Sequence, residues 1–313
     1  MDFSLIPIFV LFIITLACAV IGNTCNAYYI KFFIKNMSGF YILNAGLSLI
    51  CALVLFCVGG FKFEISAYSL LLGLAFGTIT MVYTIVNSVA IKIGPYGYTT
   101  VIVSLSTAIT AISGSIFWNE PIGIFKITGI ILMCACFYLA VDTKKEEGKH
   151  TNVKWFILCL IGLFLCASVG LIQKIHQNSI FKLELIPFLI VAFLTSGILS
   201  LLIFMLLKSR KRKTEITLKN QTDIAPKGRA NNLRKIIILS AVMIICGICT
   251  AANNALNLYL SGVVDTAVFF PIVNGIPLMM SLVVSFFLFK ERLNKKQMSG
   301  LVIGLISIVC LFI

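Results

Sequence analysis

Ten long apolar runs occupy almost the whole of this 313-residue chain, and they constrain its fold more than any other feature. Each run is about 17 to 27 residues long, and about twenty residues of helix cross the apolar core of a bilayer. The runs lie at 5–30, 40–59, 65–91, 96–118, 121–141, 155–173, 185–207, 236–260, 263–289 and 297–313. We therefore predict an all-α, polytopic membrane protein with ten transmembrane helices.

The composition agrees with a membrane protein. With 60% hydrophobic residues, 12% charged residues and a mean hydropathy of +1.06, the chain has too little polar surface to cover a water-soluble globule. The first run ends near Ala17-Cys18-Ala19, which looks like a signal-peptide cleavage site. No Lys or Arg precedes this run, so we predict a retained helix. The eleven cysteines lie almost wholly in apolar runs, and we expect packing residues rather than disulfides or metal ligands.

The 25 Lys and Arg residues are divided unevenly between the two faces that ten helices would define. With alternate loops on the same face, 21 fall on one face, and the other has only Lys62, Lys126, Lys174 and Lys182. Ten of the 21 belong to the basic loop 208–235, which we expect to lie near anionic lipid and not to bind nucleic acid. Because cytoplasmic loops are rich in Lys and Arg, we predict a plasma-membrane protein with both termini extracytoplasmic.

One short sequence pattern occurs twice. WNEPIGIFKITG at 118–129 matches FKERLNKKQMSG at 289–300, so that Glu120 corresponds to Glu291, 171 residues later. The chain therefore divides into two predicted repeats of five helices, 1–143 and 152–313. Because five is odd, the second repeat enters the membrane from the opposite side. Inverted repeats of this kind place a transporter's substrate site at their shared interface near the bilayer midplane.

Two stripes of polar residues occupy equivalent positions in the third and eighth runs. After Gly77 the third run has Thr80, Tyr83, Thr84 and Asn87, and after Gly247 the eighth has Thr250, Asn253, Asn254 and Asn257. The glycines and all four polar pairs are 170 residues apart. Positions i, i+3, i+4 and i+7 share one face of an α-helix, so each helix should carry one polar face.

Two interpretations of these stripes are open. Polar residues can join membrane helices through hydrogen bonds, which contribute about 0.6 kcal/mol each on average. Four on one face cost more to bury than such bonds return, unless they meet water or a ligand. We therefore predict that both stripes line a substrate cavity. Gln173 and Lys174 of the sixth run are further candidates, although Lys174 could instead extend to the membrane surface.

Three other residues are candidates for gating or helix capping. Pro277 falls in the middle of the ninth run, where a proline removes a hydrogen bond and is expected to bend the helix. Its counterpart in the first repeat is Ser106, so the two halves should not move identically. Glu120 and Glu291 each stand before a predicted helix, where an acid stabilises the positive end of the helix dipole.

These features resemble the EamA-type transporters of the drug/metabolite transporter superfamily. The resemblance rests on two five-helix halves, each with a Glu between its fourth and fifth helices and a Gly nine residues later, Gly129 and Gly300. The second copy, LFKERLNKKQMSGLVIGLISIV, is the more specific. The resemblance implies a ten-helix fold and transport of small metabolites. Members are often described with cytoplasmic termini, whereas the charge distribution here favours the opposite orientation.

The predicted function is transport of a small neutral or zwitterionic metabolite, such as an amino acid or nucleoside, by alternating access. Amide and hydroxyl groups supply the donors and acceptors that such solutes need. The alternatives are a flippase for a lipid or lipid-linked sugar and a non-transporting membrane scaffold. Only His150 and His176 are present, without metal-binding spacing, so we expect no enzyme, metal or cofactor. The expected partners are the solute and the lipid bilayer, and a monomer would suffice.

Overall fold

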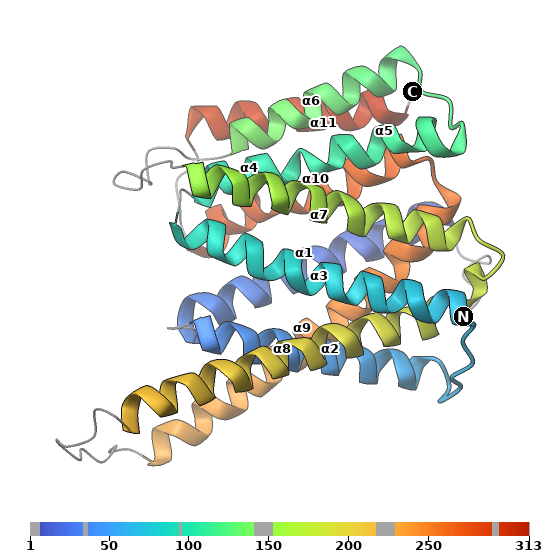
Figure 1. The fold of residues 1–313 in the computed structure, drawn as a ribbon. Coiled ribbons are helices and arrows are strands. Elements are labelled where there is room, and N and C mark those ends of the chain that lie inside the picture. Colours follow the sequence, from blue (N-terminus) through green and yellow to red (C-terminus); the bar gives the residue numbers. More distant parts are fainter. Residues whose placement is uncertain are drawn as a thin grey trace.

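The protein is an all-helical bundle in the computed structural model (Figure 1). The structure describes residues 7–33, 37–93, 96–140, 153–216, 229–289 and 294–312. None of these residues forms a strand, which confirms the all-α prediction. An α-helix bonds its backbone groups within one segment, so a long apolar sequence can enter lipid as a helix without exposing unpaired N–H or C=O groups.

Every predicted apolar run contains helix in the described part of the chain. The helices of the first half are α1 (Ile8–Phe33), α2 (Met37–Val58), α3 (Ala67–Ile93), α4 (Tyr96–Ser104), α5 (Ser106–Trp118) and α6 (Ile124–Ala140). Those of the second half are α7 (Val153–Gln177), the short 3-10 helix η2 (Lys182–Glu184), α8 (Leu185–Ile216), α9 (Arg229–Val263), α10 (Thr266–Phe289) and α11 (Lys295–Phe312).

The helices suit a lipid environment. Within the described residues, seven helices are long and apolar enough to cross a membrane, and 124–139 and 266–280 form shorter apolar helices. Large apolar side chains are also exposed on the outer surface, among them Phe9, Ile116 and Phe164. Such a surface is unfavourable in water and favourable against lipid chains. The chain is therefore a polytopic α-helical membrane protein.

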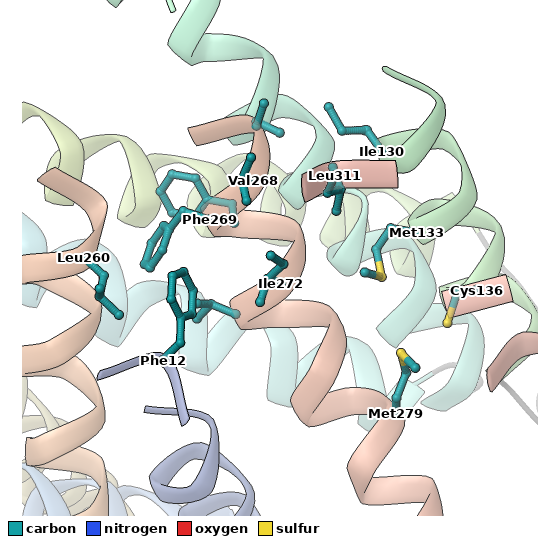
Figure 2. Close-up of a cluster of buried hydrophobic side chains, with 14 of the residues drawn as sticks. Phe12, Ile130, Met133, Cys136, Leu260, Val268, Phe269, Ile272, Met279 and Leu311 are labelled. Carbon is teal, nitrogen blue, oxygen red and sulfur yellow. The ribbon is translucent and has the colours of Figure 1, made fainter. Parts of the chain in front are cut away.

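Helices from the two halves pack against each other. The most extensive contacts are those of α6 with α11, α2 with α8, α1 with α9, and α3 with both α8 and α7. A large buried cluster surrounds α10, where Phe269 and Ile272 pack near Phe12 of α1 (Figure 2). Met133 of α6 and Leu311 of α11 belong to the same cluster. The apolar core therefore joins the two halves.

Two glycines allow close helix contacts. A Cβ atom at Gly77 of α3 would overlap the backbone oxygen of Ala192 in α8. A Cβ atom at Gly247 of α9 would overlap the side chain of Ile50 in α2. Small residues let helix backbones approach closely, which is a main source of packing energy in membranes. These glycines are the two that precede the polar stripes.

The helix of the fourth run is interrupted although it has no internal proline. Leu105 separates α4 from α5, one residue before Ser106. Pro277, the residue equivalent to Ser106, is buried inside α10, which remains one continuous element with a second proline, Pro271. The described break is therefore in the first half. The expected bend at Pro277 and the expected difference in motion between the two halves stay predictions.

The two ends of the described chain lie at the same end of the bundle (Figure 1). We call this the terminal end; the α2–α3, α5–α6, α7–α8 and α9–α10 connections also lie there. At the other end, which we call the basic end, α8 and α9 contact each other and extend together beyond the neighbouring helices (Figure 1).

Candidate functional site

A cavity of about 270 Å³ lies between six helices in the middle of the bundle. These are α1, α2, α3, α7, α8 and α9, and each contributes residues from its interior rather than its ends. The lining consists of Gly22, Asn23, Asn44, Leu47, Ser48, Cys51, Phe76, Gly77, Thr80, Val169, Ala192, Phe193, Ser196, Cys246, Thr250 and Asn254. Both predicted halves therefore contribute to one cavity with amide, hydroxyl and apolar walls.

Part of each polar stripe lines this cavity. Thr80 comes from the stripe on α3, and Thr250 and Asn254 come from the stripe on α9. The other predicted substrate-binding residues are outside the lining: Tyr83, Thr84, Asn87, Gln173, Lys174, Asn253 and Asn257. Thr84 donates its hydroxyl to the backbone oxygen of Thr80 at 2.8 Å, a bond within its own helix. Three of the eight stripe residues therefore line the cavity, and the other five do not.

Three polar atoms of the stripes have unused hydrogen-bonding capacity. Oγ1 of Thr80 and Oδ1 of Asn253 and Asn257 are buried and have no hydrogen-bond partner within the described part of the chain. A buried polar atom without a partner costs about 1 to 3 kcal/mol. Such atoms normally bond to water or a ligand, because more than about nine in ten buried polar groups are paired. Thr80 is the member of this set that reaches the cavity.

Helices α2 and α8 form a polar wall that the repeat pattern did not reveal. Asn44 donates to the Ser200 hydroxyl at 2.8 Å, and the Ser48 and Ser196 hydroxyl oxygens lie 3.5 Å apart. Asn44, Ser48 and Ser196 all line the cavity. The positions i and i+4 on each helix were the available signal in the sequence.

An apolar layer lies between the cavity and the terminal end. Leu55, Leu189 and Leu258 are buried in one cluster. Each lies about one helical turn beyond a cavity residue on its own helix: Cys51 on α2, Ala192 on α8 and Asn254 on α9. One turn further on each helix, the chain reaches a second depression. The three leucines therefore separate the two spaces.

The second depression opens at the terminal end and has a volume of about 600 Å³. Its polar residues are Lys62, Glu64, Gln177, Asn178, Ser179, Lys182 and Tyr259. Lys62, Glu64 and Lys182 are exposed to solvent, so their charges are screened. Charged groups thus line the outer depression, whereas the central cavity is lined by neutral groups.

Glu120 and Lys174 form a buried ion pair at the terminal end. Nζ of Lys174 lies 2.7 Å from Oε1 of Glu120, and the two side chains are 5% and 13% exposed. Nζ also donates to the backbone oxygen of Val264 at 3.3 Å. The ion pair connects the α5–α6 segment with α7, and Val264 adds the α9–α10 turn. Lys174 is thus occupied by protein groups and lies away from the cavity lining.

Glu120 also caps a helix, although not the one that follows it in sequence. Its Oε2 accepts the backbone N–H of Thr266 at 2.7 Å and the Thr266 hydroxyl at 2.6 Å. Thr266 is the first residue of α10, whereas α6 begins only at Ile124. A carboxylate at this position satisfies a free N–H and lies at the positive end of the α10 dipole. The predicted capping role therefore applies to α10, and Glu291 is outside the described residues.

The contacts around Glu120 and Thr266 are tightly packed. A Cβ atom at Gly114 of α5 would overlap both the Thr266 hydroxyl and the Glu120 carboxylate. Asn119 has a left-handed backbone conformation, with φ at 53°, which turns the chain so that the N–H of Glu120 bonds the oxygen of Gly114 at 3.2 Å. The turn holds Glu120 over the start of α10.

A second polar network at the terminal end includes His176. The buried His176 ring lies 3.2 Å from the Ser69 hydroxyl and 3.2 Å from the Gln177 amide nitrogen, and it stacks on Phe188. Nearby, Glu184 accepts the backbone N–H and the hydroxyl of Ser66. These bonds tie the start of α3 to the end of α7 and to η2, so the network fixes the terminal end.

Cysteines cluster between α1 and α9 without forming a metal site. Cys246 and Cys249 are three residues apart on α9, and the thiol of Cys246 donates to the backbone oxygen of Gly22 at 3.5 Å. All eleven cysteines are free. No group of three or more His, Cys, Asp or Glu residues suitable for a metal ion occurs in the described ranges.

Comparison with known proteins gives a match at the level of the fold. No family model matches the chain, and no curated protein matches it in sequence. A solved structure described only as "Crystal structure of protein" is similar over 97% of this chain and 98% of its own, with a TM-score of 0.69 and 11% sequence identity. At this identity the likeness concerns the fold alone. The chain is a polytopic α-helical membrane protein with a polar central cavity.

Proposed function

We propose that this protein is an EamA-type transporter that moves a small neutral or zwitterionic metabolite across the plasma membrane by alternating access. The observation that carries the proposal is the central cavity, which Thr80, Thr250 and Asn254 line from the two related stripes. A transporter needs such a polar site inside an apolar wall, near the middle of its helices. The unpartnered hydroxyl of Thr80 provides one hydrogen-bonding group for the solute.

The pairing of helices supports the ten-span inverted repeat that this function implies. In the proposed repeat, α1 corresponds to α7 and α3 corresponds to α9. Exchange of the two halves therefore converts the contact of α1 with α9 into the contact of α7 with α3. Both of these pairs pack closely. The pairs α2 with α8 and α6 with α11 exchange with themselves and are also close. A two-fold relation between the halves accounts for all four contacts.

The glycine contacts support the same relation. Gly77 of α3 packs on α8, and its equivalent Gly247 of α9 packs on α2. Since α2 corresponds to α8, the two contacts are equivalent under the exchange. The repeat boundaries 1–143 and 152–313 belong to the proposal.

Alternating access assigns a role to the terminal end. The layer of Leu55, Leu189 and Leu258 closes the cavity on that side, and the ion pair of Glu120 with Lys174 holds the α5–α6 segment, α7 and the α9–α10 turn together. To release solute there, the layer must separate and these contacts must rearrange. We propose that Glu120 is both the cap of α10 and part of the latch on this gate.

The orientation follows from charge. In the predicted ten-helix topology, 21 of the 25 Lys and Arg residues fall on one face, which favours a cytoplasmic location for that face. The terminal end, with the 600 Å³ depression, would then face outward. The cavity of about 270 Å³ is at the lower limit of small-molecule pockets, which span about 300 to 1,000 Å³. This volume favours a metabolite over a lipid-linked sugar.

Reconstitution tests the proposal. Purified protein in phosphatidylcholine vesicles should show counterflow of at least one solute from a panel of nucleosides, nucleobases, sugars and amino acids. Thr80→Val, which replaces the unpartnered hydroxyl by a methyl group, should reduce this flux strongly. Thr78→Val is the matched control, because Thr78 is exposed on the same helix and its hydroxyl bonds only the backbone oxygen of Leu74. Absence of flux for every solute would contradict transport and favour a scaffold.

A further inference from the structure

Within the described chain, the cavity lining contains no carboxylate, imidazole, ammonium or guanidinium group. Among the described residues that form it, the polar side chains are three asparagines, two serines and two threonines, and Cys51 and Cys246 are thiols. Burial of a carboxylate or ammonium group without a partner is strongly unfavourable. A solute with a full charge would therefore leave water without finding a compensating charge on these walls.

Helix ends are not available to replace a charged side chain. Many transporters bind charged groups at the ends of broken helices, where backbone dipoles supply partial charge. Here the six lining helices are all continuous at the level of the cavity. The described break, at Leu105, lies between α4 and α5, and neither of these helices contributes to the lining.

Charged groups at the terminal end are paired with each other or separated from the cavity by apolar residues. Lys174 and Glu120 neutralise each other. The apolar layer that contains Leu55, Leu189 and Leu258 separates the cavity from the charged outer depression. Phe76 and Phe193 add aromatic surface to the walls. The site thus offers neutral hydrogen bonds beside aromatic rings.

We infer that the central cavity selects an uncharged solute of nucleoside or nucleobase type, with hydrogen-bond donors and acceptors on a flat apolar ring, and that it rejects amino acid zwitterions and organic ions. This inference rests on the proposed transport function and narrows its substrate class. The Thr80 hydroxyl and Oδ1 of Asn254, whose Nδ2 donates to the backbone oxygen of Thr250 at 2.9 Å, bind polar edges of the solute, and the aromatic walls contact its ring face.

Solutes of one shape and different charge test this inference. Nicotinamide is neutral, nicotinate is an anion and 1-methylnicotinamide, which is methylated on the ring nitrogen, is a cation, and all three share one ring. Uridine and phenylalanine extend the comparison to a neutral nucleoside and a zwitterion. Equilibrium binding of each radiolabelled compound to the purified full-length protein should show that nicotinamide or uridine binds at least about tenfold more tightly than every charged compound. Thr80→Val should weaken that binding, and Thr78→Val should not.

The outcomes separate the two proposals. Tighter binding of nicotinate, 1-methylnicotinamide or phenylalanine, lost in Thr80→Val, would overturn the selection for uncharged solutes and leave the transport function standing. Equal binding of neutral and charged compounds would overturn the selection as well. If none of the compounds binds, and vesicles show no flux of any solute in the wider panel, both the selection and the transport function are overturned. If vesicles show flux only for other solutes of the panel, the transport function stands. Flux of uncharged solutes alone then supports the selection, and flux of charged or zwitterionic solutes overturns it.

Discussion

The Glu120 carboxylate accepts the backbone N–H of Thr266 at 2.7 Å, although the two residues are 146 positions apart. The same carboxylate pairs with Lys174, so one side chain combines a helix cap with a buried ion pair. A neutral side chain of the same shape could accept the N–H through an amide oxygen, but it could not pair with the Lys174 ammonium group. The motif that marks the first repeat therefore stabilises the beginning of α10.

Glu120→Gln should destabilise the protein clearly. The change leaves the Lys174 ammonium buried without its counter-ion, and breaking a buried pair on one side costs about 3 to 5 kcal/mol. Thermal unfolding of the detergent-solubilised protein would show this as a lowered melting temperature. Lys126→Met is the control, because its pair with Asp265 is 18% and 42% exposed and should contribute less than about 1 kcal/mol. Equal shifts in both variants would contradict the buried latch.

Gly114→Ala should disturb the same cluster from the side of α5. The added methyl group would overlap Thr266 and Glu120, so the cap must move, and we expect a loss of about 1 to 3 kcal/mol. Gly123→Ala is a suitable comparison, since a Cβ atom there meets no atom within 4 Å. The melting temperatures of the two variants are the measurement. A stable Gly114→Ala variant would show that the cluster is looser than described.

Asn257→Leu should separate a functional role of the α9 stripe from a structural one. Asn257 lies outside the cavity lining, but its Oδ1 is buried without a partner in the described structure. If this atom meets water or solute during transport, replacing the amide should abolish transport while the melting temperature stays the same or rises. Ala255→Leu is the packing control: Ala255 is buried, and overpacking should cost about 1 to 3 kcal/mol. Normal transport in Asn257→Leu with a much lower melting temperature would favour interhelical bonding.

Labelling of single cysteines in a cysteine-free background should reveal the orientation. Lys182→Cys, exposed at the terminal end, should react with an impermeant thiol reagent in intact cells. Asn220→Cys, in the basic loop and outside the described residues, should react only after lysis. The reverse pattern would place the termini in the cytoplasm.

The helix bodies could be predicted because an apolar run long enough to cross a bilayer can hardly fold otherwise in lipid. Their ends could not. Helix α8 continues through the charged residues after Lys208, and α9 begins at Arg229, before its apolar run. A helix can continue into a polar segment because each added residue extends a helix that has already formed. Hydropathy marks only the apolar part of such a helix. The break at Leu105 has no Pro or Gly to mark it.

Residues of the candidate site could be predicted only where the two repeats have polar residues at equivalent positions. The spacing of 170 residues identified Thr80, Thr250 and Asn254, all of which line the cavity. Asn44 and Ser196 follow no such spacing, and only the packing of α2 against α8 brings them together. The bond from Glu120 to Thr266 joins distant segments, so no local pattern could predict it.

Because α8 and α9 extend beyond the bundle, a small tilt of either helix near the cavity would move its far end over a larger distance. Helix α8 is held against α3 where Gly77 meets Ala192, and about 36 Å of helix separates that contact from Ile216, at 1.5 Å per residue. If the helix turns as a rigid rod, a tilt of about 10° at this fulcrum moves its tip by about 6 Å. A small rearrangement beside the cavity is therefore amplified into a displacement that distance spectroscopy can detect far from the solute.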